Sequence, residues 1–352
     1  MALSVGALRP AQIAVHAEPR TFIKSESFDA TLLILPLVTG LAAATAVLLD
    51  SRLFPVLLLA DLWFLGYHHV VATYTRLAFT VDALRRNRFM AVDLLLLMTG
   101  ASLVLAFTAG AWVVATAFLY LQWFHYMRQG YGIGRMYYRA TPEGKEAGAR
   151  DLTTDLVIYL VPIYAIAARS AAMGELFLEL PVKTVVLPGA VLTLLGLAAA
   201  LATGLWAIRS TVSFARGTLN LSYAGFVVSH VAIFLAAYIL IDDANTGWLA
   251  INIWHNFQYV LVVWMVNTKR YAGGVEPGAR FLSRISQPQR VAAYFTSCLA
   301  ISTVVYLILN RFVFALGGGL ALTVGIYMGI NFHHYIVDAL IWKRRRPVPQ
   351  AA

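Results

Sequence analysis

The chain has 352 residues, of which 60% are hydrophobic and only 12% are charged, with a mean hydropathy of +0.72. Soluble domains carry about 25% charged residues, so this composition excludes an ordinary soluble protein. The net charge of +10 does not predict nucleic-acid binding, because the cations lie at the ends of apolar runs, where they anchor and orient membrane spans. The only cysteine, Cys298, excludes an intramolecular disulfide framework and a cysteine-based metal site.

Apolar stretches recur along almost the whole chain, and a helix needs about 20 mostly apolar residues to cross a bilayer. We therefore predict an all-α, polytopic membrane bundle of ten spans, with one transmembrane domain over residues 30–342. A cytoplasmic leader of residues 1–29 precedes this domain, and a basic cytoplasmic tail of residues 343–352 follows it. The ten spans are 30–49, 53–75, 90–108, 111–130, 153–168, 184–207, 220–241, 246–267, 291–309 and 314–341.

The distribution of Lys and Arg sets the expected orientation. With ten spans, 23 of the 27 cations fall on the side of the two termini, and only Arg52, Arg169, Lys183 and Arg311 fall on the other. Cytoplasmic loops carry an excess of Lys and Arg. Both termini are therefore predicted to be cytoplasmic, and we expect the protein to reside in a bacterial inner membrane.

Seven of the eight histidines lie inside the predicted spans. At 1.5 Å per residue, all seven fall between the cation-rich end and the midplane of the membrane. Ionisable groups at such depth are rare and usually functional. We predict that these histidines meet in one layer of a site that opens toward the inner leaflet. They are His68, His69, His125, His230, His255, His333 and His334.

Other polar residues follow the histidines at helical spacing and are expected to share their faces. Asp338 lies four residues after His334, and Asp61 lies seven before His68. Both are candidate metal ligands or hydrogen-bond partners of ligating histidines. Gln258 and Tyr259, three and four residues after His255, are candidates for hydrogen bonds to a metal-bound oxygen.

Imidazole is a suitable ligand for iron, copper, zinc and nickel. Seven imidazoles exceed the needs of one ion and match two, so we predict a buried polyhistidine site with two metal ions. A redox metal in such a site is suited to the activation of dioxygen against an apolar, lipid-like substrate. Of the seven histidines, His230 is the one with the strongest alternative as a packing residue.

The histidine clusters at 68–69, 125, 230, 255 and 333–334 resemble those of the histidine-rich integral-membrane non-haem di-iron class. This class contains fatty-acid desaturases, hydroxylases and alkane monooxygenases. The resemblance implies iron as the metal and an oxidoreductase that uses dioxygen. The HxxxH and HxxHH boxes of the class do not occur in this chain.

Two further expectations follow. Arg128, Arg135 and Arg139 could bind the head group of a lipid or substrate at the inner surface. No flavin, haem-attachment or ferredoxin motif is found, so an external electron donor, a protein or a quinol, would supply electrons.

A transporter with a histidine proton relay, a copper site and a bis-histidine haem remain alternatives. The transporter is less favoured because no inverted repeat is visible and the outer halves of the histidine-bearing spans look nearly bare of polar groups.

Overall fold

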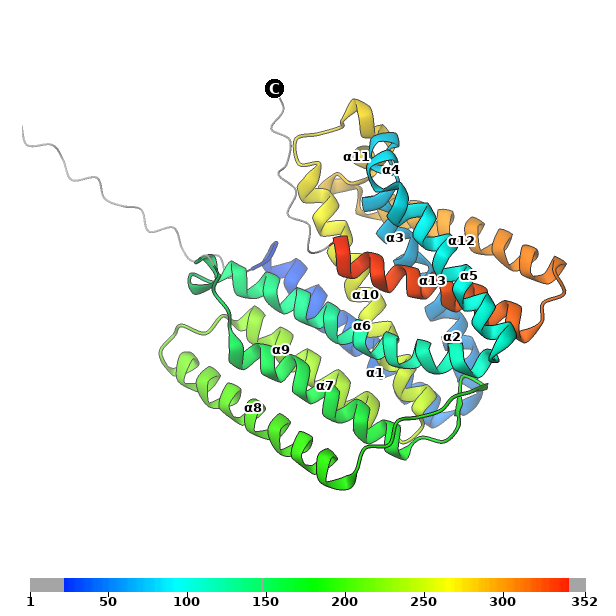
Figure 1. Cartoon of the computed structure of the whole chain (residues 1–352). Helices are drawn as coiled ribbons and strands as arrows, with labels where there is room; N and C mark the ends of the chain where they lie inside the picture. The colour runs from blue at the N-terminus through cyan, green and yellow to red at the C-terminus, as the bar shows by residue number, and fades with distance from the viewer. Residues whose placement is uncertain (1–21, 147, 342–352) are drawn as a thin grey trace, which may run out of the picture.

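The computed structural model describes residues 22–146 and 148–341 and is almost entirely helical (Figure 1). The predicted leader and tail lie largely or wholly outside the described residues. The long helices are α1 (Glu26–Leu49), α5 (Leu94–Thr108), α6 (Ala111–Ala140), α7 (Leu152–Ala172), α8 (Gly189–Ala215), α9 (Leu221–Leu235), α10 (Ala244–Arg270), α12 (Val291–Ala315) and α13 (Leu320–Ile341). The shorter ones are α2 (Phe54–Asp61), α3 (Tyr67–Leu77), α4 (Val81–Arg88) and α11 (Arg280–Ile285).

Three π-helical turns join or extend these helices in the described part of the chain. The first turn, Leu62–Gly66, joins α2 to α3, the second, Phe89–Asp93, joins α4 to α5, and the third, Ala236–Leu240, extends α9. Between α7 and α8 the chain forms a small antiparallel hairpin of β1 (Leu176–Phe177) and β2 (Leu180–Pro181).

Nine helical segments of the described chain are long and apolar enough to cross a membrane. The all-α class and the membrane-spanning character are thus confirmed, whereas the sidedness of the termini stays a prediction. One of the ten expected spans, 111–130, is not among these nine segments. It forms the first part of α6, which continues to Ala140. Its second half carries Arg128, Arg135 and Arg139, and this polarity sets it apart from the other spans.

Helix α10 is the centre of the bundle (Figure 1). Most of its residues are buried on all sides, as expected for a helix surrounded by protein. It packs against α1, α3 and α9, while α13 packs against α5 and α6. The approach of α13 to α5 is close because a Cβ at Gly329 would lie 2.6 Å from the Cα of Thr99. Small residues allow this kind of packing between membrane helices.

Candidate metal centre

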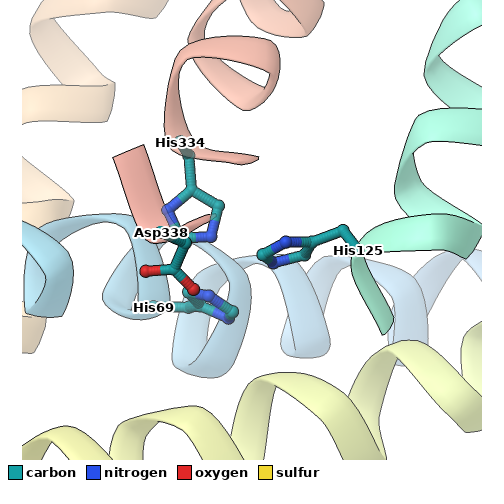
Figure 2. Close-up of side chains that lie close together, drawn as sticks. All are labelled: His69, His125, His334 and Asp338. Carbon is teal, nitrogen blue, oxygen red and sulfur yellow. The ribbon is translucent and has the colours of Figure 1, made fainter. Parts of the chain in front are cut away.

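Four helices each contribute one buried imidazole to a single cluster at the centre of the bundle. These are His69 of α3, His125 of α6, His255 of α10 and His334 of α13. The ring centroids of His69 and His334 lie 4.5 Å apart, those of His125 and His255 4.9 Å, and those of His125 and His334 5.1 Å. Figure 2 shows His69, His125 and His334 turned toward one another, with the carboxylate of Asp338 beside them. Segments far apart in the sequence thus build one site.

The donor atoms of this cluster are close enough to share an ion. One potential ligand atom each from His69, His125, His334 and Asp338 lies within 4.8 Å of the other three. Two nitrogen or oxygen donors on opposite sides of one ion lie roughly 4.2 Å apart, because each bond is about 2.1 Å long. A small inward movement of the side chains would therefore complete a coordination shell.

The hydrogen bonding of the rings fits the same interpretation. His69 Nε2, His125 Nε2, His255 Nδ1 and His334 Nε2 are buried and have no hydrogen-bond partner among the described residues. Buried polar atoms in folded proteins are nearly always partnered. Unpartnered nitrogens on His69, His125 and His334, the three histidines of the group of close donor atoms, therefore fit a metal ion that accepts their lone pairs, and His255 lies beside this group.

The second nitrogen of two of the rings is held by a neighbour. His69 Nδ1 donates to Asn256 Oδ1 at 2.8 Å, and His334 Nδ1 lies 3.1 Å from Thr73 Oγ1. An amide oxygen only accepts, so the bond to Asn256 places the proton of His69 on Nδ1 and leaves the Nε2 lone pair for a ligand. Outer partners of this kind are typical of metal-ligating histidines.

Asp61 joins the cluster through an amide. Asn256 Nδ2 lies 3.5 Å from Asp61 Oδ1, and Asn252 Nδ2 donates to Asp61 Oδ2 at 2.5 Å. The hydroxyl of Tyr126 donates to Asn252 Oδ1 at 2.5 Å. Asp61 is therefore linked to His69 only through Asn256, whereas we expected it to ligate the metal or to hydrogen-bond a histidine directly.

Asp338 lies close to His69 and next to Tyr259. The ring of Tyr259 stacks on that of His69 with the centroids 3.8 Å apart and the planes 9° apart. Its hydroxyl donates to Asp338 Oδ1 and lies 2.7 Å from Thr73 Oγ1. Tyr259 thus positions both a candidate carboxylate ligand and a candidate imidazole ligand.

The other three intramembrane histidines do not belong to this cluster. His68 packs edge-on against Phe295 with the centroids 5.6 Å apart, and His333 Nε2 donates to the carbonyl of Met90 at 2.7 Å. His230 Nε2 donates to the carbonyl of Ile158 at 3.1 Å. Each of the three also has one unpartnered ring nitrogen, so convergence, and not a free nitrogen alone, distinguishes the four clustered rings.

Helical geometry explains why only one histidine of each HH pair belongs to the cluster. Adjacent residues differ by about 100° around a helix axis, so one ring faces the bundle centre while its neighbour faces another helix. We expected both members of each pair to line one cavity, but only His69 and His334 do so.

The π-helical turn selects His69 over His68. Two α-helical turns take about 7.2 residues, which would align Asp61 with His68, as the sequence spacing suggested. A π turn inserts one further residue, and the turn Leu62–Gly66 lies between Asp61 and the pair. The register moves by one position, so that His69 shares the face of Asp61.

The remaining predicted site residues lie away from the cluster. Gln258 Nε2 donates to the carbonyl of Leu32 in α1 at 3.4 Å, because the residue is 100° away from Tyr259 around α10. Arg128 donates to the hydroxyl of Tyr159, and Arg135 donates to the carbonyl of Ala149 at 2.8 Å. Arg139 is exposed near the end of α6.

A cavity of about 360 Å³ adjoins the clustered rings. Its wall includes Trp248 and Asn252, which precede His255 on α10, and Tyr327 and Asn331, which precede His334 on α13. Both helices run toward the cation-rich end, so the cavity extends from the rings in the opposite direction. The cavity thus extends away from the cation-rich end, toward which we expected the site to open, and which of the two ends faces the cytoplasm stays a prediction.

The polar residues along this cavity correct a second expectation. The outer halves of the spans looked bare, yet Asn252, Gln122 and Asp61 form a connected group there. Trp248 Nε1 donates to Gln122 Oε1 at 2.8 Å, and Gln122 Nε2 lies 3.4 Å from Asn252 Oδ1. Single amides in apolar runs contribute little to mean hydropathy, and only the fold brings them together.

Comparison with known proteins adds no family to this description. No family model, no curated protein and no solved structure matches the chain.

Proposed function

We propose that the protein is an integral-membrane metalloenzyme that binds a redox-active metal, iron, and uses dioxygen to oxidise an apolar, lipid-like substrate. The observation that carries the proposal is the convergence of three buried histidines, each with an unpartnered ring nitrogen, and one buried carboxylate beside a cavity. His69, His125, His334 and Asp338 would be the ligands, with His255 as a fifth donor.

The donor set favours iron for a chemical reason. Neutral imidazoles with one carboxylate are typical of non-haem iron sites that keep a position open for dioxygen. Five donors suit one ion better than two, so we propose a single iron in place of the pair expected from the sequence. The grouping of three histidines and a carboxylate also favours an ion over a haem, which needs a planar slot between two imidazoles.

Bound iron would supply the activation of dioxygen, and the protein would exclude water, orient the ligands and hold the substrate. The bundle excludes water from the site, Asn256 and Thr73 orient His69 and His334, and the cavity holds the substrate beside the open position. Hydroxylation of a C–H bond by O₂ needs two electrons and two protons and releases one water. An external donor, a quinol or a reduced carrier protein, would supply the electrons.

Oxygen uptake tests this proposal. Purified protein loaded with Fe²⁺ would be mixed with a dithionite-reduced mediator and a lipid extract, and the products would be analysed by mass spectrometry. We expect substrate-dependent oxygen consumption and products heavier by one oxygen or lighter by two hydrogens. The activity should vanish in His334→Ala and persist in His333→Ala, a matched variant of the adjacent histidine. Equal loss in both variants, or no uptake by iron-loaded protein with any lipid fraction, would contradict the proposal.

A further inference from the structure

One wall of the cavity consists of three tyrosines from three helices. The rings of Tyr67 and Tyr306 stack with centroids 3.6 Å apart and planes 12° apart, and Tyr327 lies 6.3 Å from Tyr306. The hydroxyl of Tyr327 donates to Asn310 Oδ1. Asn310 lines the cavity and is also exposed, so it connects the cavity wall with the surface of the protein.

The surface of α12 beside this tyrosine wall combines polar and apolar side chains. Asn310 lies five residues before the end of α12 at Ala315, or about 8 Å from that end. Leu307, Ile308 and Phe314 near it on α12 are exposed and apolar, whereas Arg311, the next residue, is an exposed cation. Asn310 and Arg311 thus form a polar spot near this end of α12, bordered by apolar side chains. Of the two, Asn310 lines the cavity and is hydrogen-bonded to Tyr327.

The hairpin covers a different part of the same cavity. Leu178 lines the cavity, and its backbone N–H donates to Asn245 Oδ1 at 3.0 Å. Phe177 packs edge-on against Trp248, another lining residue, with the centroids 5.6 Å apart. Leu178 and Glu179 have φ of 49° and 61°, a left-handed conformation that persists in such residues only where contacts hold it. The hairpin therefore acts as a cap between the cavity and the solvent beyond this end of the bundle.

From these features we infer that a single-chain amphiphile enters the cavity from the bilayer, through the tyrosine wall. Its hydroxyl or carbonyl group remains at Asn310 and Tyr327, and its hydrocarbon chain extends toward His334. At 360 Å³ the cavity is at the small end of the roughly 300–1,000 Å³ typical of ligand sites, which favours one chain over a two-chain phospholipid.

The polar groups deeper in the cavity support this orientation of the ligand. Gln122, Tyr126 and Asn252 already hydrogen-bond with one another and with their neighbours, so they do not need a polar ligand group. The hydroxyl of Tyr335 is buried, lines the cavity and has no partner among the described residues. It can donate to an oxygen near the clustered rings. The route rests on the proposed function only for the reaction at its end, since binding of the chain needs no metal.

Photo-crosslinking of a lipid probe tests the route. Full-length protein in nanodiscs would be irradiated with hexadecanol that carries a diazirine in its chain, and the labelled peptides would be identified by mass spectrometry. We expect labelling on Tyr306 to Asn310 of α12 and on Tyr327 to Tyr335 of α13. Unlabelled hexadecanol should compete, and hexadecane should compete about tenfold less well because it lacks the polar group. Labelling of lipid-facing residues alone, or equal competition by the two compounds, would overturn the inference.

Two variants that fill the cavity sharpen the test. Asn331→Trp and Met328→Trp place a large ring in the cavity, whereas Ile308→Trp adds the same ring on the lipid-facing side of α12. Cavity labelling should fall about tenfold in the first two and stay unchanged in the third, because filled space excludes the probe. Unchanged labelling in monodisperse Asn331→Trp and Met328→Trp protein would refute the route.

Measuring labelling on metal-stripped and iron-loaded protein separates this inference from the proposed function. Saturable labelling of the cavity in a protein that binds no iron would refute the proposed iron enzyme but support the entry of a lipid. Iron binding without labelling of the cavity would refute the entry of a lipid but leave the proposed iron enzyme standing.

Discussion

At the scale of single residues, the environment of His69 shows how the chain orients a candidate metal ligand. The ring is fixed by three contacts: the Asn256 amide on Nδ1, the Tyr259 ring on its face and the neighbouring His334 ring. Asn256 in turn reaches the buried carboxylate of Asp61. A polarised amide thus takes the place that a carboxylate often occupies behind a ligating histidine.

Replacement of this amide should weaken metal binding without emptying the site. We expect Asn256→Leu to raise the dissociation constant for Fe²⁺ by about 10- to 100-fold, as is common for lost outer partners of histidine ligands. Competition with a chelator of known affinity would measure the change. Gln258→Leu is the matched control, because its side chain points toward α1, and it should leave the affinity unchanged. Equal effects of the two substitutions would contradict the role of Asn256.

The packing of His230 leads to a second prediction at this scale. A Cβ at Gly130 would lie 2.5 Å from His230 Cε1, and the hydrogen bond to Ile158 prevents that ring from moving away. Gly130→Ala should therefore lower the free energy of unfolding by about 1–3 kcal/mol. Gly132→Ala meets nothing within 4 Å on the same helix and should gain up to about 1 kcal/mol in helix propensity. Thermal unfolding in detergent would compare them, and equal midpoints would refute the close packing of His230.

At the scale of elements, the π turn between α2 and α3 determines which residues of α3 face the histidine cluster. It contains five residues, Leu62–Gly66, and Gly66 also lines the cavity. The extra residue costs helical regularity, yet without it Asp61 and His69 would no longer share a face. Single π turns of this kind are often found at functional sites.

Deletion of one residue from this turn should restore a continuous α-helix and rotate His69 by about 100° relative to Asp61. We expect deletion of Leu65 to abolish metal binding while the helix content, measured by circular dichroism, stays near that of the wild type. A deletion in the turn Ala236–Leu240, which lies at the end of α9, serves as the control and should keep the metal. Retention of metal after deletion of Leu65 would contradict this account of the register.

These elements also show how far the sequence could predict the site. Hydropathy predicted the all-α class and nearly all of the spans, and the depth of the histidines predicted a common layer. The sequence could not distinguish His69 from His68 or His334 from His333, because the facing of each residue depends on the π turn and on which neighbours pack on each side. Thr73, Asn252 and Asn256 were missed, since an isolated Thr or Asn in an apolar run gives a weak signal until a buried histidine or carboxylate is seen beside it.

At the scale of the whole molecule, the two ends of the bundle differ in charge. The loop between α10 and α12 and the end of α6 carry cations, whereas the hairpin and the start of α10 carry few. The cavity extends toward the cation-poor end. If the excess of cations marks the cytoplasmic side, the substrate approaches through the outer half of the bilayer.

Cysteine labelling in intact cells of an expression host would test this orientation. The native Cys298 is buried and should not react with a maleimide. In a Cys298→Ser background, Asp242→Cys at the cation-poor end should react with a membrane-impermeant maleimide, and Arg280→Cys should react only after the cells are opened. Both positions are exposed in the fold. The reverse pattern would place the cation-rich end outside.

The most direct test of the account is the iron content per chain, measured by plasma mass spectrometry on protein purified and reconstituted anaerobically with Fe²⁺. Wild type would be compared with His69→Ala and His334→Ala and with the adjacent replacements His68→Ala and His333→Ala. We predict close to one iron per chain in wild type and in both adjacent variants, and almost none in His69→Ala and His334→Ala. Two irons per wild-type chain with losses in all four variants would instead indicate a larger ring of histidines. A wild-type protein that holds no metal would contradict the metal centre itself.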